Sequence, residues 1–135
     1  MQDNLFLDTN ILLYALCNKD QKKQSVAKKL VLQNASISTQ VINETSVNLL
    51  KKLHFQEEEV LEFIESCYKR YTIHHIDRQS ILQASKLRSR YKLSFYDSLI
   101  VSSALSLQCQ TLYSEDMQHH LCVDDRLTIV NPFLQ

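Results

Sequence analysis

Four acidic residues that lie far apart in the sequence are the side chains best placed to do chemistry. Asp8 ends an apolar run in "NLFLDTN", Asp116 follows a second run in "QTLYSED", and Glu44 and Asp97 lie inside "STQVINETSV" and "SFYDSLIVSS". Carboxylate oxygens without cysteine or histidine partners suit Mg²⁺ or Mn²⁺ rather than zinc. Metal ions held in this way hydrolyse phosphodiester bonds by activating water and stabilising the leaving oxygen. If the four acids converge, they predict a metal-dependent site for such a reaction.

Two of these acids also have a purely structural explanation. Asp8, or Asn10 two residues later, could cap the helix that begins with the apolar residues after it. Ser94 and Asp97 match the Ser/Thr-x-x-Asp/Glu capping pattern at the start of another helix. Taken singly, neither acid distinguishes a cap from a metal ligand.

Glu44 is harder to explain as a structural residue. It lies three residues after Val41 and three before Val47, so these side chains share one face of a predicted helix, and that face is apolar. An ionised glutamate on a buried face is costly unless it is paired or bound to a metal. We therefore interpret Glu44 as a functional residue.

Bringing the acids together has an electrostatic cost. Two carboxylates about 5 Å apart repel each other by about 3 kcal/mol at an effective dielectric constant of about 20. A folded protein keeps such a cluster ionised only with a cation, and otherwise protonates some of its members. A cluster of the four acids would therefore be a site for a cation.

The elements that would position these acids alternate between short apolar strands and amphipathic helices. Strands are predicted at residues 4–7, 35–38, 71–76, 110–113 and 127–130, and helices at residues 21–33, 40–53, 56–71, 77–91 and 95–107, with a further helix from Asn10 and a short one near Asp116. Such alternation is typical of an α/β fold, a three-layer α/β/α sandwich with a mostly parallel central sheet. We assign residues 1–135 to a single domain.

This architecture also predicts where a site would lie. In an open parallel sheet, sites form at the carboxyl ends of the strands, in the crevice where the strand order reverses. Asp8 and Asp116 both come at or just after the end of a strand. We therefore expect both residues at the same edge of the sheet.

The composition narrows the function further. Lysine and arginine number 15, as do aspartate and glutamate, so nucleic-acid binding would depend on a local basic patch. The absence of glycine excludes the Gly-rich phosphate loop and the G-x-G-x-x-G dinucleotide turn. The apolar runs are too short for a signal peptide or a membrane span, and the four cysteines form no C-x-x-C pair. We expect a cytoplasmic protein with reduced cysteines and no membrane association.

Basic residues just before Asp97 are candidates for contacts with a phosphate backbone. Arg88, Arg90 and Lys92 come at the end of the preceding helix. Arg88 and Lys92 share one helical face and Arg90 lies on another, so a solvated helix end is the alternative. The basic residues of "KKLH", after the Glu44 helix, are similar but weaker candidates.

The motifs around the four acids are similar to those of a known family. "FLDTNILLY", "STQVINE", "SFYDSLIVSSAL" and "LYSEDMQ" occur in the order and approximate spacing of PIN-domain ribonucleases, with the closest likeness to the VapC-type toxins of bacterial toxin–antitoxin pairs. The resemblance runs from Phe6 to Met117, which is nearly the whole chain. One departure is His120, which stands where many relatives have glycine, so the chain must turn there in another way. Four motifs in order, each with its acid, resemble an intact rather than a degenerate site.

The resemblance implies a three-layer α/β/α fold and Mg²⁺- or Mn²⁺-dependent endonucleolytic cleavage of RNA. The residues that it assigns to metal binding and catalysis are Asp8, Glu44, Asp97 and Asp116. It gives Asn10 and Ser114 the role of orienting the carboxylates or waters that bind the metal, without binding the metal themselves. It also implies a homodimer, and a cognate antitoxin whose segment covers the site.

Two other functions stay open on the sequence alone. A metal-dependent phosphatase or a phospho-acceptor domain can use a similar sheet, but haloacid-dehalogenase-like phosphatases need D-x-D, and here the third position is Asn10. Phospho-acceptor receiver domains carry paired acids at the end of the first strand, where this chain has only Asp8. The other alternative is a non-catalytic PIN copy that binds RNA, against which the intact acids argue.

Overall fold

The structure, a computed structural model, describes residues 4–134; residues 1–3 and 135 of the predicted domain lie outside the described residues. The strands are β1 (Leu5–Leu7), β2 (Ala35–Ser38), β3 (Thr72–His74), β4 (Thr111–Tyr113), β5 (Cys122–Val123) and β6 (Leu127–Val130). The helices are α1 (Thr9–Leu16), α2 (Gln21–Val31), α3 (Thr39–Lys51), α4 (Glu57–Arg70), α5 (Arg78–Arg90) and α6 (Phe95–Ser106). The predicted bounds agree with these within about two residues, apart from the segment around Asp116 and the additional strand β5.

The six strands form one sheet in the order β3-β2-β1-β4-β6-β5. All neighbouring strands pair in parallel except β5, which is antiparallel to β6. In the middle of the sheet Phe6 is opposite Ser36 of β2 on one side and Leu112 of β4 on the other. The predicted mostly parallel sheet is confirmed.

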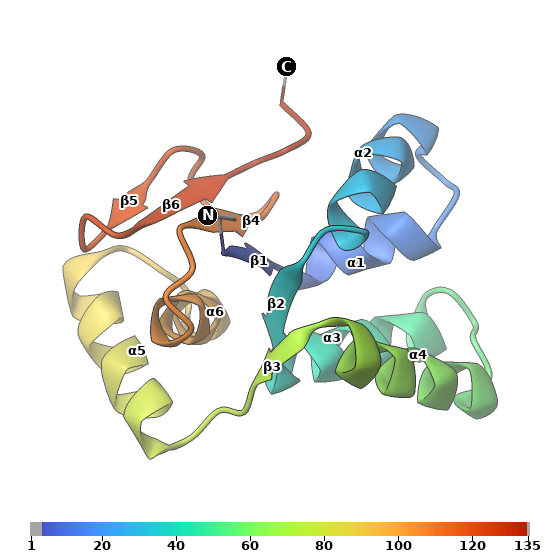
Figure 1. Ribbon diagram of the computed structural model, residues 1–135, viewed down its shortest axis with the longest axis horizontal. Helices are drawn as coiled ribbons and strands as arrows, with labels where there is room; N and C mark the ends of the chain where they lie inside the picture. Colours follow the sequence, from blue (N-terminus) through green and yellow to red (C-terminus); the bar gives the residue numbers. More distant parts are fainter. Residues whose placement is uncertain (1–3, 135) are drawn as a thin grey trace.

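Helices cover both faces of this sheet (Figure 1). The connections from β1 to β2 and from β2 to β3 run in one direction across the sheet, whereas the connection from β3 to β4 returns in the other. Right-handed crossovers then place α1–α4 on one face and α5 and α6 on the opposite face. This is the predicted three-layer α/β/α sandwich.

The core lies between the sheet and these helices. β1 is buried along its whole length, as a central parallel strand covered on both faces should be. α6 is buried from Ser98 to Leu105, because it packs between β2 and α5. Each fully buried leucine or isoleucine contributes about 1.5–3 kcal/mol relative to an exposed one. This packing fixes the first turn of α6, which carries Asp97.

The short helix predicted near Asp116 is wrong, because the chain bends there without forming a helix. The N–H of His120 donates to Ile129 O at 2.7 Å, and the N–H of Ile129 donates to Leu121 O at 2.9 Å, so this segment pairs with β6 instead of coiling. His120 has φ 70°, in the left-handed region that favours glycine, which is how the chain turns without the glycine of its relatives.

β5 was not predicted from the sequence, since it is only two residues long. It forms a hairpin with β6 through Asp124 and Asp125, which have φ angles of 51° and 56°. Positive φ at both central residues is the geometry of a type I′ hairpin turn, where aspartate is tolerated.

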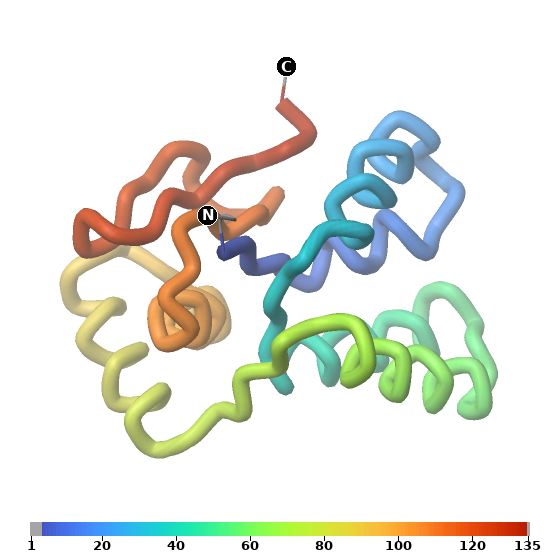
Figure 2. Tube along the Cα trace, viewed as in Figure 1, coloured from blue at the N-terminus to red at the C-terminus, as the bar shows by residue number. Residues whose placement is uncertain are grey.

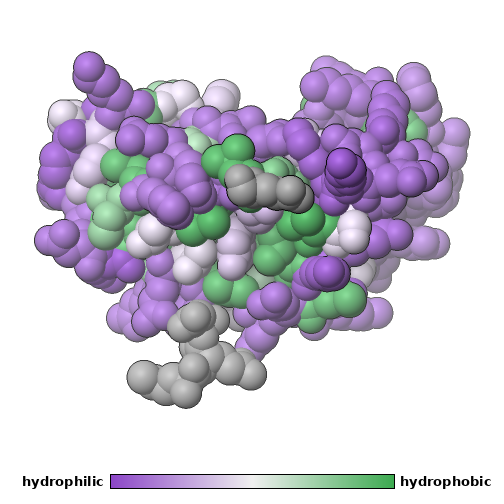
Figure 3. Space-filling view, turned by 90° about the horizontal axis from the view of Figure 1, so that it is seen from above, coloured by the Kyte–Doolittle hydropathy of each residue, from purple (hydrophilic) through white to green (hydrophobic). Residues whose placement is uncertain are grey.

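The molecule presents a largely hydrophilic surface in the view of Figure 3, with apolar residues gathered near the middle of that face. Among residues 4–134, no helix combines the length and the apolar character that crossing a membrane requires.

Candidate active site

The candidate site lies where the order of the strands reverses. From the central strand β1 the chain runs outward to β2 and β3, and it then returns to β4 on the other side of β1. The N–H of Asp8 donates to Tyr113 O at 3.0 Å, so the ends of β1 and β4 stay side by side up to the acids. This crevice at the carboxyl ends of the strands is the place predicted for a site in such a sheet.

Asp8 is a buried carboxylate that caps α1 as well as facing the site. Its Oδ1 accepts from the N–H of Thr9 at 2.7 Å, and its Oδ2 accepts from the hydroxyl of Ser114 at 2.7 Å. Burial raises the pKa of Asp8 from 3.8 to about 7; the two hydrogen bonds oppose this rise, and the negative charges of Asp97 and Glu44 add to it. The cap explanation of Asp8 is therefore confirmed, and its role as a metal ligand stays a prediction.

Asp97 faces the same crevice from the first turn of α6. The hydroxyl of Ser94 accepts from the N–H of Asp97 at 3.1 Å, which caps the helix as the sequence pattern predicts. Burial raises the pKa of the Asp97 carboxyl group, a hydrogen bond between this side chain and that of Ser94 lowers it, and the charge of Asp116 raises it. Asp97 therefore lies within electrostatic reach of both Asp8 and Asp116.

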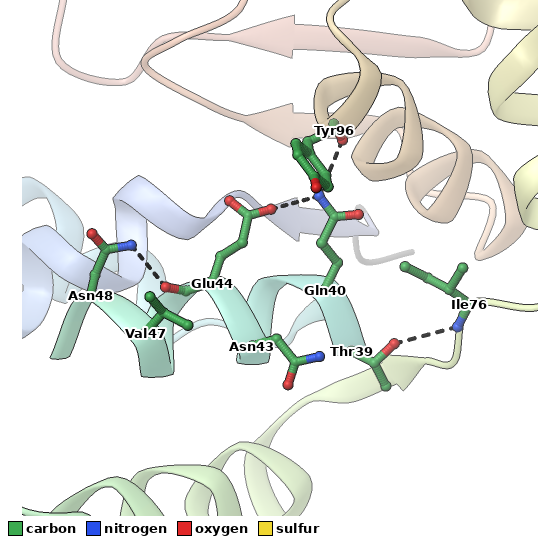
Figure 4. A pocket seen from close by; sticks show the side chains of 8 residues that line it. All are labelled: Thr39, Gln40, Asn43, Glu44, Val47, Asn48, Ile76 and Tyr96. Carbon is green, nitrogen blue, oxygen red and sulfur yellow. Dashed lines mark hydrogen bonds between the residues drawn. The ribbon is translucent and has the colours of Figure 1, made fainter. Parts of the chain in front are cut away.

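Glu44 reaches the site from α3, but the reason given for it from the sequence was wrong. Its helical neighbour Val47 is 48% exposed, so the face that they share with Val41 is not buried throughout. Glu44 is half-buried, and its Oε1 accepts from Gln40 Nε2 at 2.6 Å (Figure 4). The carboxylate lines a pocket instead of lying in the core.

Asp116 is exposed, and two polar residues hold the loop that carries it. Asn10 Nδ2 donates to Asp116 Oδ2 at 3.1 Å, while Asn10 Oδ1 accepts from the N–H of Glu115 at 3.2 Å. The hydroxyl of Ser114 accepts from the N–H of Asp116 at 3.2 Å while donating to Asp8. Asn10 and Ser114 thus connect the end of β1 with the end of β4, in the positions that the sequence motifs gave them.

The negative charge of this cluster has no positive partner among the described residues. In the range 4–134, no lysine, arginine or histidine lies within ion-pair distance of any of the four acids. Within the same range, no three Asp, Glu, His or Cys side chains are close enough together to hold a metal ion as they stand. The crevice is therefore a concentration of acids that repel one another through a partly buried space.

Glu115, next to Asp116, is held by a network that the sequence did not indicate. Lys23 of α2 forms an ion pair with Glu115, and the hydroxyl of Tyr14 donates to Glu115 at 2.6 Å. The end of the chain returns beside α1 and α2 (Figure 2), where the ring of Phe133 packs edge-on against that of Tyr14 at 5.0 Å. Lys23 lies over both rings, so Glu115 is paired with Lys23 and Tyr14 and not with the other acids.

The basic residues at the end of α5 have partners of their own. Arg88 donates to the hydroxyl of Ser98 at 2.8 Å and lies over the ring of Phe95 at 4.4 Å. Arg90 pairs with Asp124 at 2.6 Å, and Lys92 is exposed. Arg88 therefore lies at the start of α6, the helix that carries Asp97, whereas Arg90 is held against the β5–β6 turn.

The fold is shared with solved structures of toxin–antitoxin systems. A toxin–antitoxin complex from Klebsiella pneumoniae matches at 19% identity over 95% of this chain and 97% of that chain, with a TM-score of 0.68. VapBC2 from Rickettsia felis, bound to a DNA fragment from its promoter, matches at 18% identity over 95% and 99%, with a TM-score of 0.66. VapC20 from Mycobacterium tuberculosis, a Sarcin-Ricin loop cleaving toxin, matches at 18% identity over 83% and 89%, also at 0.66. At these identities the likeness is one of fold.

Comparison of the sequence itself gives the family. No curated protein sequence matches the chain. The family model of the PIN domain matches residues 5–122, which include all four acids and both polar residues that connect β1 with β4. The chain belongs to the PIN-domain family, and it has the fold of the VapC-type toxins.

Proposed function

We propose that this chain is an Mg²⁺- or Mn²⁺-dependent endoribonuclease and the toxin of a toxin–antitoxin pair. The observation that carries the proposal is the burial of the Asp8 carboxyl group beside other acids. Its buried carboxyl group faces Asp97 and Glu44, and its pKa is raised to about 7. A carboxylate placed where its own charge is disfavoured, beside further acids, is an arrangement that a bound cation would stabilise.

The donor set fits a hard cation. The four acids offer only carboxylate oxygens, which Mg²⁺ and Mn²⁺ prefer, and the four hydrogen bonds that these carboxylates accept leave further lone pairs on their oxygens. The residues that would hold the ion are Asp8, Glu44, Asp97 and Asp116. When bound, such an ion activates water and stabilises the charge on the phosphate and the leaving oxygen.

The chain's own residues would prepare this site. Ser114 and the N–H of Thr9 hold the Asp8 carboxylate in one orientation. Asn10 and Ser114 hold the loop of Asp116 against the end of β1. Glu44 and Asp116 are less buried than Asp8, so their side chains have room to rotate towards a cation. The buried residue thus supplies the fixed ligand and the outer residues the adjustable ones.

The proposed substrate is RNA, and the proposed partners are a cognate antitoxin and a second copy of the chain. The support for the antitoxin is that solved structures of this fold include toxin–antitoxin complexes, and the support for RNA is the cleaving activity named for VapC20. We further propose that Arg88, Arg90 and Lys92 contact the RNA backbone beside Asp97. A cytoplasmic location away from membranes follows from this function.

Cleavage of labelled total RNA tests the proposal. Wild type, Asp8→Asn and the control Asp125→Asn are purified identically and assayed in Mg²⁺, in Mn²⁺ and in EDTA. Asp125 is an exposed acid in the β5–β6 turn, at a φ that asparagine also adopts. We expect wild type and Asp125→Asn to cut RNA with either metal, and Asp8→Asn to be inactive.

The alternatives give different results. Equal cleavage by wild type and Asp8→Asn would contradict the site assignment. Metal-independent RNA binding without cleavage would favour a non-catalytic RNA-binding PIN copy. Labelling of the chain by acetyl phosphate, lost in Asp8→Asn, would instead favour a phospho-acceptor domain.

A further inference from the structure

Beside the acids, a pocket of about 580 Å³ opens between α3 and the start of α6. Its volume falls within the range of about 300–1,000 Å³ that is typical of small-ligand sites. Glu44 lies between Asn48 at one end and Ile76 at the other, and the amide of Gln40 lies between Glu44 and Tyr96 (Figure 4). The other lining residues are Thr39, Asn43, Val47, Asn48 and Ile76. Most of this lining has no part in the proposed metal chemistry.

Gln40 has an acceptor that the fold leaves unused. The residue is 9% exposed, and its Nε2 donates both to Glu44 at 2.6 Å and to the carbonyl of Tyr96 at 3.3 Å. Its Oε1 is buried and has no hydrogen-bond partner within residues 4–134. The opposite orientation of the amide would place Oε1 against a carboxylate and a carbonyl, so the donors must face that side. A ligand with an N–H group would satisfy the unused oxygen.

Tyr96 gives the pocket an aromatic wall. It is 65% exposed, although a core position would normally bury a tyrosine ring, and it lies directly before Asp97 in the first turn of α6. Its ring lies at 78° to that of Phe95, with the two ring centroids 5.6 Å apart, and most of the residue is open to solvent. Aromatic faces of this kind stack with the bases of single-stranded nucleic acids.

We propose that this pocket binds a nucleobase of single-stranded RNA, in the nucleotide next to the bond that is cut. The proposal rests on the proposed ribonuclease function and specifies its substrate as an unpaired strand with an extruded base. The base stacks on Tyr96, and an N–H on its edge donates to Gln40 Oε1. Because all four bases have such a donor, Asn43 and Asn48, whose amides can donate and accept, would decide between them.

The surface beside this pocket offers a route for the rest of the strand. The pocket shares Asn48 with a second hollow, of about 260 Å³, which Asn10 and Lys52 also line. That hollow shares Lys19 and Lys52 with a third, of about 500 Å³. The phosphates that follow the bound base therefore pass Asn10, beside the acids, and continue towards two lysines.

Binding measurements in EDTA test the pocket separately from catalysis. In the Asp8→Asn background, fluorescence anisotropy compares the affinity for labelled single-stranded RNA of random sequence with that for an abasic strand of equal length. Tyr96→Ala removes only the ring, because the contact of Tyr96 with Gln40 is through its backbone carbonyl. Tyr68→Ala is the matched control, since Tyr68 is an exposed tyrosine of α4 and does not line the pocket.

We expect Tyr96→Ala to weaken RNA binding about 5- to 150-fold, the range of base stacking on one aromatic residue. Tyr96→Phe should retain the affinity of the parent, Tyr68→Ala should bind both strands as the parent does, and Tyr96→Ala should not change the affinity for the abasic strand. Equal loss of affinity for both strands would overturn the proposal, because the base would not be what Tyr96 contacts. Unchanged binding of the random-sequence RNA by Tyr96→Ala would also overturn the proposal, because the ring would then contribute nothing to the affinity. If wild type does not cleave RNA and the Asp8→Asn parent does not bind it, the ribonuclease function itself fails, and the base pocket with it.

Discussion

Replacing Asp8 with asparagine should change how the stability of the metal-free protein depends on pH. Burial raises the pKa of this carboxyl group from 3.8 to about 7. Between these two values the unfolded chain has lost the proton while the folded protein keeps it. The folded state therefore binds the extra proton, and stability falls as the pH rises through that interval.

The size of the effect follows from the same pKa shift. In the interval between the two pKa values, each pH unit costs about 1.4 kcal/mol of unfolding free energy. From pH 5 to pH 8, Asp8 alone should therefore lower the stability by about 2–3 kcal/mol, reaching its full cost above pH 7. An asparagine of the same shape has no proton to lose, so Asp8→Asn should lack this decrease.

Urea unfolding followed by circular dichroism, at pH 5 and at pH 8 in EDTA, measures the effect. Wild type is compared with Asp8→Asn and with Asp125→Asn, an exposed control in the β5–β6 turn. Wild type and Asp125→Asn should each lose about 2–3 kcal/mol more than Asp8→Asn over this interval. Saturating Mn²⁺ at pH 8 should restore stability to wild type but not to Asp8→Asn. An identical pH dependence in all three proteins would refute the reasoning, because the ionisation of Asp8 would then cost nothing in the folded state.

Three further changes test other contacts of the site. Ser114→Ala removes a hydrogen bond that lowers the pKa of Asp8, so the carboxylate should form only at higher pH. RNA cleavage at neutral pH should fall about 10- to 100-fold, and its pH profile should move to higher pH. An unshifted pH profile would contradict this role of Ser114. Lys23→Met releases Glu115, so the amides of the loop at residues 114–116 should exchange hydrogen faster, whereas unchanged exchange would mean that Asn10 and Ser114 hold the loop alone. Arg90→Ala breaks a largely exposed ion pair with Asp124, so the free energy of unfolding should change by no more than about 1 kcal/mol. The slope of log affinity for RNA against log salt concentration should become shallower by about 1, the value for one lost phosphate contact. An unchanged slope would remove Arg90 from the RNA contacts.

Those parts of the fold that depend on continuous patterns could be predicted from the sequence. The central strand β1 is an unbroken apolar run, and α4 shows a regular spacing of apolar residues, so both elements appear in the sequence itself. The position of Asp8 and Asp116 at one edge followed from the parallel sheet alone. Their proposed role as metal ligands stays a prediction.

Features that depend on contacts between distant segments could not be predicted. The ion pair between Lys23 and Glu115 joins two residues 92 positions apart, and nothing in either neighbourhood indicates it. The helix expected near Asp116 failed because pairing with β6 outweighed the local pattern. For Glu44, the helical spacing selected a residue that lines the pocket, but it wrongly predicted that the helix face around Glu44 is buried. The exposure of Val47 on that face depends on which helices pack against it, and the local sequence does not specify this.

The central claim is that the acids at the ends of β1 and β4 hold a divalent cation, and anomalous diffraction from crystals grown with Mn²⁺ tests it most directly. The account predicts one or more manganese peaks in contact with the carboxylates of Asp8 and Asp97, and none there in crystals of Asp8→Asn. Manganese bound only elsewhere, or no peak at this edge of the sheet at saturating Mn²⁺, would contradict the claim.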